Sequence, residues 1–147
     1  MIGKWNLDFK MGFTDDETVM LDFDNTTFKD VRYWAEETMK RFKLGGFLIL
    51  KSSKNNYHVV FNRRVDWSEN MSIVASVTLA CRNPRMTKWF LLQCRKSEPT
   101  LRVGPKGSKP SPRIVYRYGR QDDQIREFLL ERRRIKRIMK KLAGGFD

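Results

Sequence analysis

Two short apolar runs, separated by five polar residues, constrain the fold of this chain more than any other feature. Residues 47–51 (FLILK) and 57–61 (YHVVF) have the length and the β-branched or aromatic content of strands. The residues between them, 52–56 (SSKNN), are of the types that favour turns. The two runs therefore predict a β-hairpin.

Further strand-like and helix-like segments lie on both sides of the hairpin. Residues 18–24 predict a strand, and residues 28–42 predict a helix because their apolar residues recur at i, i+3 and i+4 until Gly45-Gly46 ends the pattern. A second apolar helix, with its start at 66–70, is expected over 71–81 and is broken at 82–85. The remaining expected elements are strands over 89–94, 100–103 and 113–118, a Gly- and Pro-rich loop over 104–112, and a long basic helix over 121–142.

The expected order is β-α-β-β-α-β-β-β-α, whose first six elements match a split β-α-β pattern. This order predicts an α+β fold: a ferredoxin-like antiparallel sheet with helices packed on one face, extra strands and a long basic C-terminal helix. The length of 147 residues fits one domain. We divide it into an N-terminal arm (1–17), a core (18–118) and a basic C-terminal helix with its tail (119–147).

Positive charge is concentrated in the second half of the chain. The whole sequence has a net charge of +13; residues 1–81 are neutral with eleven basic and eleven acidic side chains, whereas residues 82–120 contain eleven basic and one acidic. A one-sided basic block of this kind is typical of a protein that binds a polyanion, and most often of one that binds DNA or RNA. The alternative is a generally basic chain whose charge serves solubility.

The cysteine and histidine content limits other classes of function. Two cysteines and one histidine, with no CxxC pair, argue against a disulfide scaffold and a zinc site. No apolar run is long enough to span a membrane. We therefore expect no zinc, no membrane partner and a cytoplasmic, intracellular and reducing location.

Asp22 and Asp24 form an acidic pair at the end of a predicted strand. Residues two apart on a strand point to the same side, so the two carboxylates would repel each other unless a divalent cation or basic side chains neutralised them. The pair is therefore a candidate catalytic and metal site. In the alternative interpretation, Asp24 caps the following helix and Asp22 faces solvent.

His58, the single histidine, follows a loop that contains Ser52, Ser53 and Lys54. By alternation, His58 and Val60 share one face of the strand over 57–61. His58 is a candidate donor to a phosphate, with the loop residues beside it. The alternative is a half-buried histidine hydrogen-bonded within the sheet.

Arg102 and Lys106 flank Gly104-Pro105 in the sequence LRVGPKG. An arginine that leaves a strand and enters a Gly-rich basic loop suits phosphate binding. A flexible charged loop is the alternative.

Taken in order, LDFD (21–24), SSKNNYH (52–58) and LRVGPK (101–106) resemble the motifs of the archaeo-eukaryotic primase and primase–polymerase superfamily. The resemblance extends over residues 18–118 and implies an RRM-like sheet. It implies that Asp22 and Asp24 hold Mg²⁺ or Mn²⁺ and act with His58 in catalysis. It also implies that Ser52, Ser53, Lys54 and His58 contact a nucleoside triphosphate, and that Arg102 and Lys106 face phosphates or the template.

The family's third metal ligand, an aspartate, has no counterpart here. Residues 71–97 contain no carboxylate, and the expected position reads C-R-N-P at 81–84. Since two-metal phosphoryl transfer uses several carboxylates, we expect a nucleic-acid-binding replication protein with weakened catalysis, such as an accessory module that contacts other replication proteins. The alternatives are a minimal metal-dependent primase or polymerase (a nucleotidyltransferase) and an RRM-like RNA binder.

The long C-terminal helix has an apolar side and a strongly basic one. It could lie along a nucleic-acid backbone, dock on the core with a solvated basic face, or lie on a membrane surface. The basic residues that we expect at nucleic acid, along the chain, are Arg82, Arg85, Lys109, Arg113, Arg133, Arg134, Lys136 and Arg137.

Overall fold

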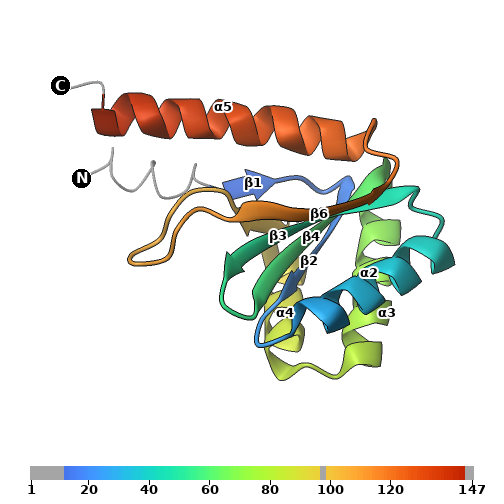
Figure 1. The fold of residues 1–147 in the computed structure, drawn as a ribbon. Coiled ribbons are helices and arrows are strands. Elements are labelled where there is room, and N and C mark those ends of the chain that lie inside the picture. The colour runs from blue at the N-terminus through green and yellow to red at the C-terminus, as the bar shows by residue number, and fades with distance from the viewer. Residues whose placement is uncertain (1–11, 97–98, 145–147) are drawn as a thin grey trace.

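The computed structural model describes residues 12–96 and 99–144, so most of the predicted N-terminal arm (1–11) lies outside the described residues. Figure 1 shows the order of the elements. They are β1 (Gly12–Thr14), β2 (Thr18–Phe23), α2 (Phe28–Arg41), β3 (Gly46–Ser53), β4 (Asn56–Arg64), α3 (Trp67–Cys81), α4 (Pro84–Lys96), β5 (Thr100–Arg102), β6 (Arg113–Gly119) and α5 (Gln124–Gly144).

The main sheet has four antiparallel strands in the order β2-β4-β3-β6. The predicted hairpin is confirmed, because β3 and β4 pair directly and are joined by a tight turn. Asn55 in this turn has a φ of 58°, a left-handed conformation that asparagine tolerates better than most residues. The predicted α+β class is confirmed, and β2 and β3 lie on either side of β4, as the split β-α-β pattern requires.

Helices α2, α3 and α4 cover one face of the main sheet (Figure 1). Alternate strand residues, such as Leu21, Ile49 and Val59, are fully buried against this layer. Val31 and Ala35 of α2 meet them at helical spacing. The amphipathic pattern predicted over 28–42 therefore corresponds to the face of α2 that packs on the sheet.

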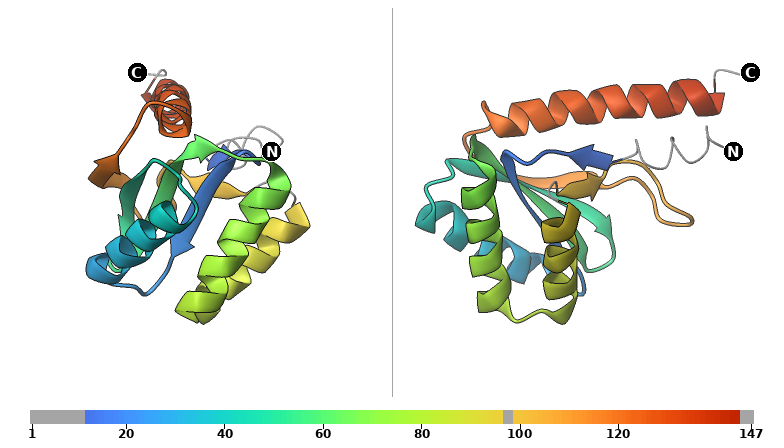
Figure 2. Two further views of the ribbon diagram at one scale, coloured as in Figure 1. Left: turned by 90° about the vertical axis from the view of Figure 1, so that its right-hand side faces the viewer. Right: turned by 180° about the vertical axis from the view of Figure 1, so that it is seen from behind.

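The opposite face of the main sheet is also covered, which the expectation of helices on one face did not include. The two-stranded sheet β1-β5 and helix α5 pack there, as the left-hand view in Figure 2 shows. Phe13 of β1 meets Phe128 of α5 with ring centroids 5.1 Å apart, and both are buried with Leu48 of β3. Docking of the terminal helix on the core, one of the three arrangements that the sequence left open, is therefore observed.

The strand predicted over 89–94 is wrong, because this segment belongs to helix α4. Pro84 stands at the first position of the helix, where a missing N–H costs nothing. Met86 and Gln93 are buried on one face, whereas Leu91 and Leu92 are exposed. The apolar run that resembled a strand therefore occupies several faces of a helix.

Gly46 and Gly119 allow β3 and β6 to approach closely where the chain turns toward α5. A Cβ on Gly46 would lie 2.0 Å from the backbone oxygen of Arg120, and Gly119 has a φ of +71°. The backbone N–H of Arg120 donates to the oxygen of Gly45. This contact fixes the point from which α5 crosses the sheet.

Among the described residues, no helix has both the length and the apolar composition that a membrane span requires.

Candidate functional site

The strand register brings Asp22 and His58 together on one face of the sheet. Asp22 of β2 is paired with His58 of β4, which in turn is paired with Leu50 of β3. Leu50 and Val60 belong to the apolar cluster under α5, so Asp22 and His58 face the same side by alternation. His58 Nε2 lies 3.7 Å from Asp22 Oδ1, which is longer than a hydrogen bond.

Asp22 lies on the edge strand β2 and is largely buried. Its side chain is 21% exposed. Burial, and after it the charge of Asp24, raises the pKa of Asp22 from 3.8 to about 7, whereas the charges of Arg102 and Lys109 lower it. The carboxyl group therefore titrates near neutral pH, which is typical of groups at functional sites.

His58 is more deeply buried than the alternative interpretation expected, with 5% of its surface exposed. Burial, and then the positive charge of Arg102, lowers its pKa from 6.5 to about 3. The imidazole is neutral at physiological pH, so His58 and Asp22 do not form an ion pair there. A neutral imidazole keeps one nitrogen as an acceptor and the other as a donor.

Asp24 does not cap the helix that follows it, so the alternative interpretation of the acidic pair is wrong on this point. The cap of α2 is Thr27, whose side chain accepts from the backbone N–H of Asp30. The backbone oxygen of Asp24 instead accepts from Thr26 Oγ1 and Asn83 Nδ2, both at 2.9 Å. The second part of that interpretation also fails, because Asp22 is mostly buried.

The turn between α3 and α4 reaches the acidic pair through Asn83. The family resemblance placed a third carboxylate in this segment, and the side chain that contacts Asp24 from it is an amide. Arg82, which ends α3 with a φ of 52°, and Arg85 are exposed on either side of Asn83. Two of the expected nucleic-acid contacts therefore lie at the same end of the sheet as Asp24.

The serines of the hairpin are engaged locally. Ser52 Oγ donates to the backbone oxygen of Asn56, and Asn56 Nδ2 donates to Ser53 Oγ. Lys54 is exposed at the tip of the turn. These contacts stabilise the hairpin. Ser52 is buried, with 6% of its surface exposed.

Arg102 connects β5 to the end of β3 and to the base of the 104–112 loop. Its Nη1 donates to the oxygens of Gly104 and Pro110 at 2.6 and 2.8 Å, and its Nη2 donates to the oxygen of Ser52 at 3.2 Å. These bonds use three of the five N–H groups of the guanidinium. The charge of Arg102 also acts on Asp22 and His58, which places it beside the acidic pair.

The 104–112 loop is a small hairpin whose tip is closed by Lys106 and Lys109. Their backbones exchange hydrogen bonds of 3.0 and 2.9 Å, and Gly107 between them has a φ of 59°. Lys109 is the lysine whose charge acts on Asp22. The family resemblance implied that Lys106 faces phosphates or the template, and Lys109 was expected at nucleic acid. In the fold, it is the charge of Lys109 that acts on the acidic pair.

Asp15, Asp16 and Glu17 form a second acidic group. In the sequence they end the predicted N-terminal arm, and no motif singled them out. Within residues 12–96 and 99–144, Asp15, Asp16 and Glu17 are the one group of three or more His, Cys, Asp or Glu side chains that could hold a metal ion, with ligand atoms within 4.8 Å of one another. Asp15 accepts from Thr18 Oγ1 and Gln124 Nε2, which ties the bend between β1 and β2 to the start of α5. This carboxylate already has a structural role.

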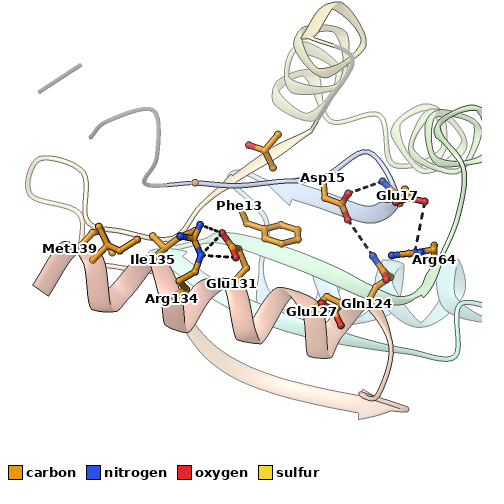
Figure 3. Close-up of a pocket in the computed structure, with 13 residues that line it drawn as sticks. Phe13, Asp15, Glu17, Arg64, Gln124, Glu127, Glu131, Arg134, Ile135 and Met139 are labelled. Atoms are coloured by element: carbon orange, nitrogen blue, oxygen red, sulfur yellow. Dashed lines mark hydrogen bonds and ion pairs between the residues drawn. The ribbon is translucent and has the colours of Figure 1, made fainter. Parts of the chain in front are cut away.

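A pocket lies next to this acidic group, and Asp22 does not line it. It has a volume of about 600 Å³ and lies between β1 and α5 (Figure 3). Phe13, Ile135 and Met139 line it together with Glu127 and Glu131. None of the residues that the sequence motifs single out contributes to it, apart from Arg134, which pairs with Glu131.

The remaining basic residues are distributed over β6 and α5. Arg113 begins β6 opposite Lys51 of β3 and is exposed. Arg133, Lys136 and Arg137 line a groove between β6 and α5, whereas Arg134 points to the other side of the helix.

Comparisons of this chain with protein-family models, curated proteins and solved structures find no match to any of them.

Proposed function

We propose that this protein binds the phosphates of a nucleotide beside Asp22 and His58, as part of a nucleic-acid-binding replication protein with an RRM-like, primase-type core. The observation that carries the proposal is the convergence of Asp22, His58 and Arg102, which come from three separate strands. These are residues of the three motifs on which the family resemblance rests. Their meeting at one place depends on the fold, and sequence order alone does not require it.

The charges around the acidic pair suit a phosphate that arrives with a cation. Lys109 and Arg102 act on Asp22 from the 104–112 side, and Arg82 and Arg85 flank the turn at Asp24. Phosphate oxygens can accept from such side chains, with guanidinium groups offering paired donors. A bare phosphate would be repelled by Asp22 and Asp24, so these carboxylates favour a phosphate whose charge a metal ion shares.

The residues present fit one Mg²⁺ or Mn²⁺ ion better than two. Mg²⁺ and Mn²⁺ each prefer oxygen ligands, and Asp22 and Asp24 supply two carboxylates. The side chain that reaches the pair from the turn before α4 is the amide of Asn83, which adds no negative charge. A bound ion would offset part of the charge of the triphosphate, while His58, held neutral, would offer a hydrogen bond to it.

This charge count favours a binding or accessory module with weakened catalysis. Catalysis by two metals requires carboxylates that fix both ions and balance their charge. The alternative proposal is a minimal primase or polymerase, and the titration of Asp22 near neutral pH favours it, because reactive carboxyls are often buried in this way. Both proposals place the protein inside the cell, where Cys81 and Cys94, which are free, would stay reduced.

Calorimetric titration of Mn²⁺ and then a nucleoside triphosphate into the protein tests the proposal. We expect a single Mn²⁺ site and triphosphate binding that Asp22→Asn abolishes. Glu37→Gln is a matched control, because it also removes one carboxylate and Glu37 is exposed on α2. Absence of heat with the wild-type protein, or equal loss in both variants, would contradict nucleotide binding at this site.

Labelled nucleotide incorporation with Mg²⁺ and with Mn²⁺ separates the two proposals. The binding-module proposal expects no primer extension above background. Template-dependent extension that is lost in Asp22→Ala would support the nucleotidyltransferase instead.

A further inference from the structure

A groove between β6 and α5 carries positive charge without any negative charge. Its volume is about 300 Å³, and none of the residues that line it is an aspartate or glutamate. The basic residues along it are Arg117, Arg132, Arg133, Lys136, Arg137 and Lys140.

The positive charges in the groove act on one another. Burial and then the charge of Arg117 lower the pKa of Arg132, and burial and then the charge of Arg132 lower the pKa of Lys136. Arg132 Nε is buried and has no hydrogen-bond partner within the described part of the chain. Groups arranged in this way are stabilised when a polyanion lies among them, because it satisfies the donors and removes the repulsion.

The other flank of α5 has a different composition, so the groove is more than the solvated side of a basic helix. Glu127 and Glu131 face the pocket beside β1, and Arg134 pairs with Glu131 there (Figure 3). The acidic residues of α5 and one of its arginines are thus turned toward β1. The residues turned toward β6 are basic, except for the apolar Leu129.

Residues 110–112 connect a wall of the groove to the surroundings of the acidic pair. Arg132 Nη2 donates to the backbone oxygen of Pro112, and Arg102 Nη1 donates to that of Pro110. One short segment therefore contacts both the wall of the groove and the arginine beside Asp22. Figure 1 shows α5 running above β6 toward the loop that contains this segment.

We propose that this groove binds the sugar–phosphate backbone of a single nucleic-acid strand and directs it toward the Asp22 site. The proposal rests on the proposed function in taking nucleic acid as the ligand and Asp22 as the place to which the strand leads. Ile114 and Leu129 add apolar surface among the charges, on which a sugar or a base can pack. An anionic membrane fits less well, because a lipid surface requires an apolar face that projects beside the charges. Ile114 and Leu129 lie inside the groove, and the exposed Leu130, Ile138 and Leu142 of α5 do not line it.

Two double variants of α5 test the proposal with equal change in net charge. Arg133→Gln/Arg137→Gln removes two charges from the groove, and Arg126→Gln/Lys141→Gln removes two charges of α5 that do not line it; all four residues are exposed. Binding of a fluorescein-labelled oligothymidylate is measured by anisotropy over a series of salt concentrations. For a single strand, the slope of log affinity against log salt changes by about 0.7 for each phosphate contact.

We expect the groove variant to bind roughly tenfold more weakly at low salt and its slope to become shallower by about 1.4. The control variant should stay within about twofold of the wild type, since diffuse attraction by exposed charges is small. Arg117→Gln, on the other wall, should reduce the slope by about 0.7. Circular dichroism and thermal unfolding show whether each variant is folded.

Equal losses in the two double variants would overturn the groove while leaving nucleic-acid binding in place. No binding by the wild-type protein would overturn the groove together with the nucleic-acid part of the proposed function, while nucleotide binding at Asp22 is measured separately. Binding to phosphatidylserine vesicles that depends on Arg133 and Arg137, without binding to the oligonucleotide, would show that the partner is a membrane.

Discussion

Asp22 and His58 predict an unusual dependence of stability on pH, which only their separate replacement reveals. The pKa of Asp22 rises on folding from 3.8 to about 7, so the folded state binds more protons than the unfolded state between these values. Stability from this carboxyl is fully present below pH 3.8 and is lost as the pH rises to about 7. At 1.36 kcal/mol for each pH unit, the loss is about 4 kcal/mol.

His58 has the opposite effect over nearly the same range. Its pKa falls on folding from 6.5 to about 3, so the unfolded state binds more protons between these values. Stability is therefore lost as the pH falls from 6.5 to about 3, again by roughly 4 to 5 kcal/mol. Between pH 4 and 6.5 the two contributions cancel, and the pair together changes stability little.

Urea unfolding of three proteins between pH 4 and pH 8 tests this argument. In Asp22→Asn the effect of His58 remains, so the free energy of unfolding should rise by up to about 1.4 kcal/mol per pH unit up to pH 6.5. In His58→Gln the effect of Asp22 remains, and the free energy should fall over the same range. Above pH 7, the amide introduced by Asp22→Asn avoids burying a charge, so this variant should be more stable than the wild type by roughly 2 to 4 kcal/mol.

The slopes decide the outcome, because any packing defect in a variant shifts stability equally at every pH. Profiles for Asp22→Asn and His58→Gln that run parallel to the wild-type profile would refute the argument. They would mean that Asp22 and His58 titrate as they do in an unfolded chain.

Four further variants test contacts around the site and between β3 and β6. Arg102→Ala removes three hydrogen bonds to backbone oxygens and should destabilise the protein by about 2 to 4 kcal/mol and open the 104–112 loop to proteases; unchanged cleavage there would contradict the role of Arg102. Asn83→Ala removes the donor to the backbone oxygen of Asp24 and to Thr26 Oγ1, and should lower stability by about 1 to 2 kcal/mol in thermal unfolding. Unchanged stability would show that Asn83 does not fix the turn before α4 to Asp24. Gly46→Ala places a Cβ 2.0 Å from the oxygen of Arg120 and should cost several kcal/mol, whereas Gly107→Ala meets nothing within 4 Å and should cost only about 1 kcal/mol for its left-handed φ; equal costs would contradict the close approach of β3 and β6.

The parts of the fold that sequence patterns predicted are those fixed by local alternation. The hairpin of β3 and β4 followed from two apolar runs and a polar turn, and alternation placed His58 and Val60 on one face. Asp22 faces the same side because its strand pairs with β4. Alternation therefore gives the face on which His58 lies, and the pairing of β2 with β4 brings Asp22 to that face.

The parts that sequence patterns missed depend on contacts between distant segments. Residues 89–94 contain aromatic and apolar residues that suit a strand as well as a helix, and burial of Met86 and Gln93 decides for the helix. The coverage of the second sheet face depends on α5 meeting Phe13 across more than one hundred residues. No local pattern reports such a contact, nor that Lys109 acts on Asp22.

The burial of Asp22 gives a physical reason why the site would bind a divalent cation together with a phosphate. At neutral pH, the folded chain must either keep a proton on Asp22 or bear the cost of a buried carboxylate, since His58 stays neutral and lies 3.7 Å away. A divalent cation replaces that proton and removes the cost, but leaves excess positive charge between Arg102, Lys109 and the ion. A phosphate neutralises this excess. Metal affinity should therefore increase with pH up to about 7 and increase again when a triphosphate is present, and the two ligands should each strengthen the binding of the other by the same factor.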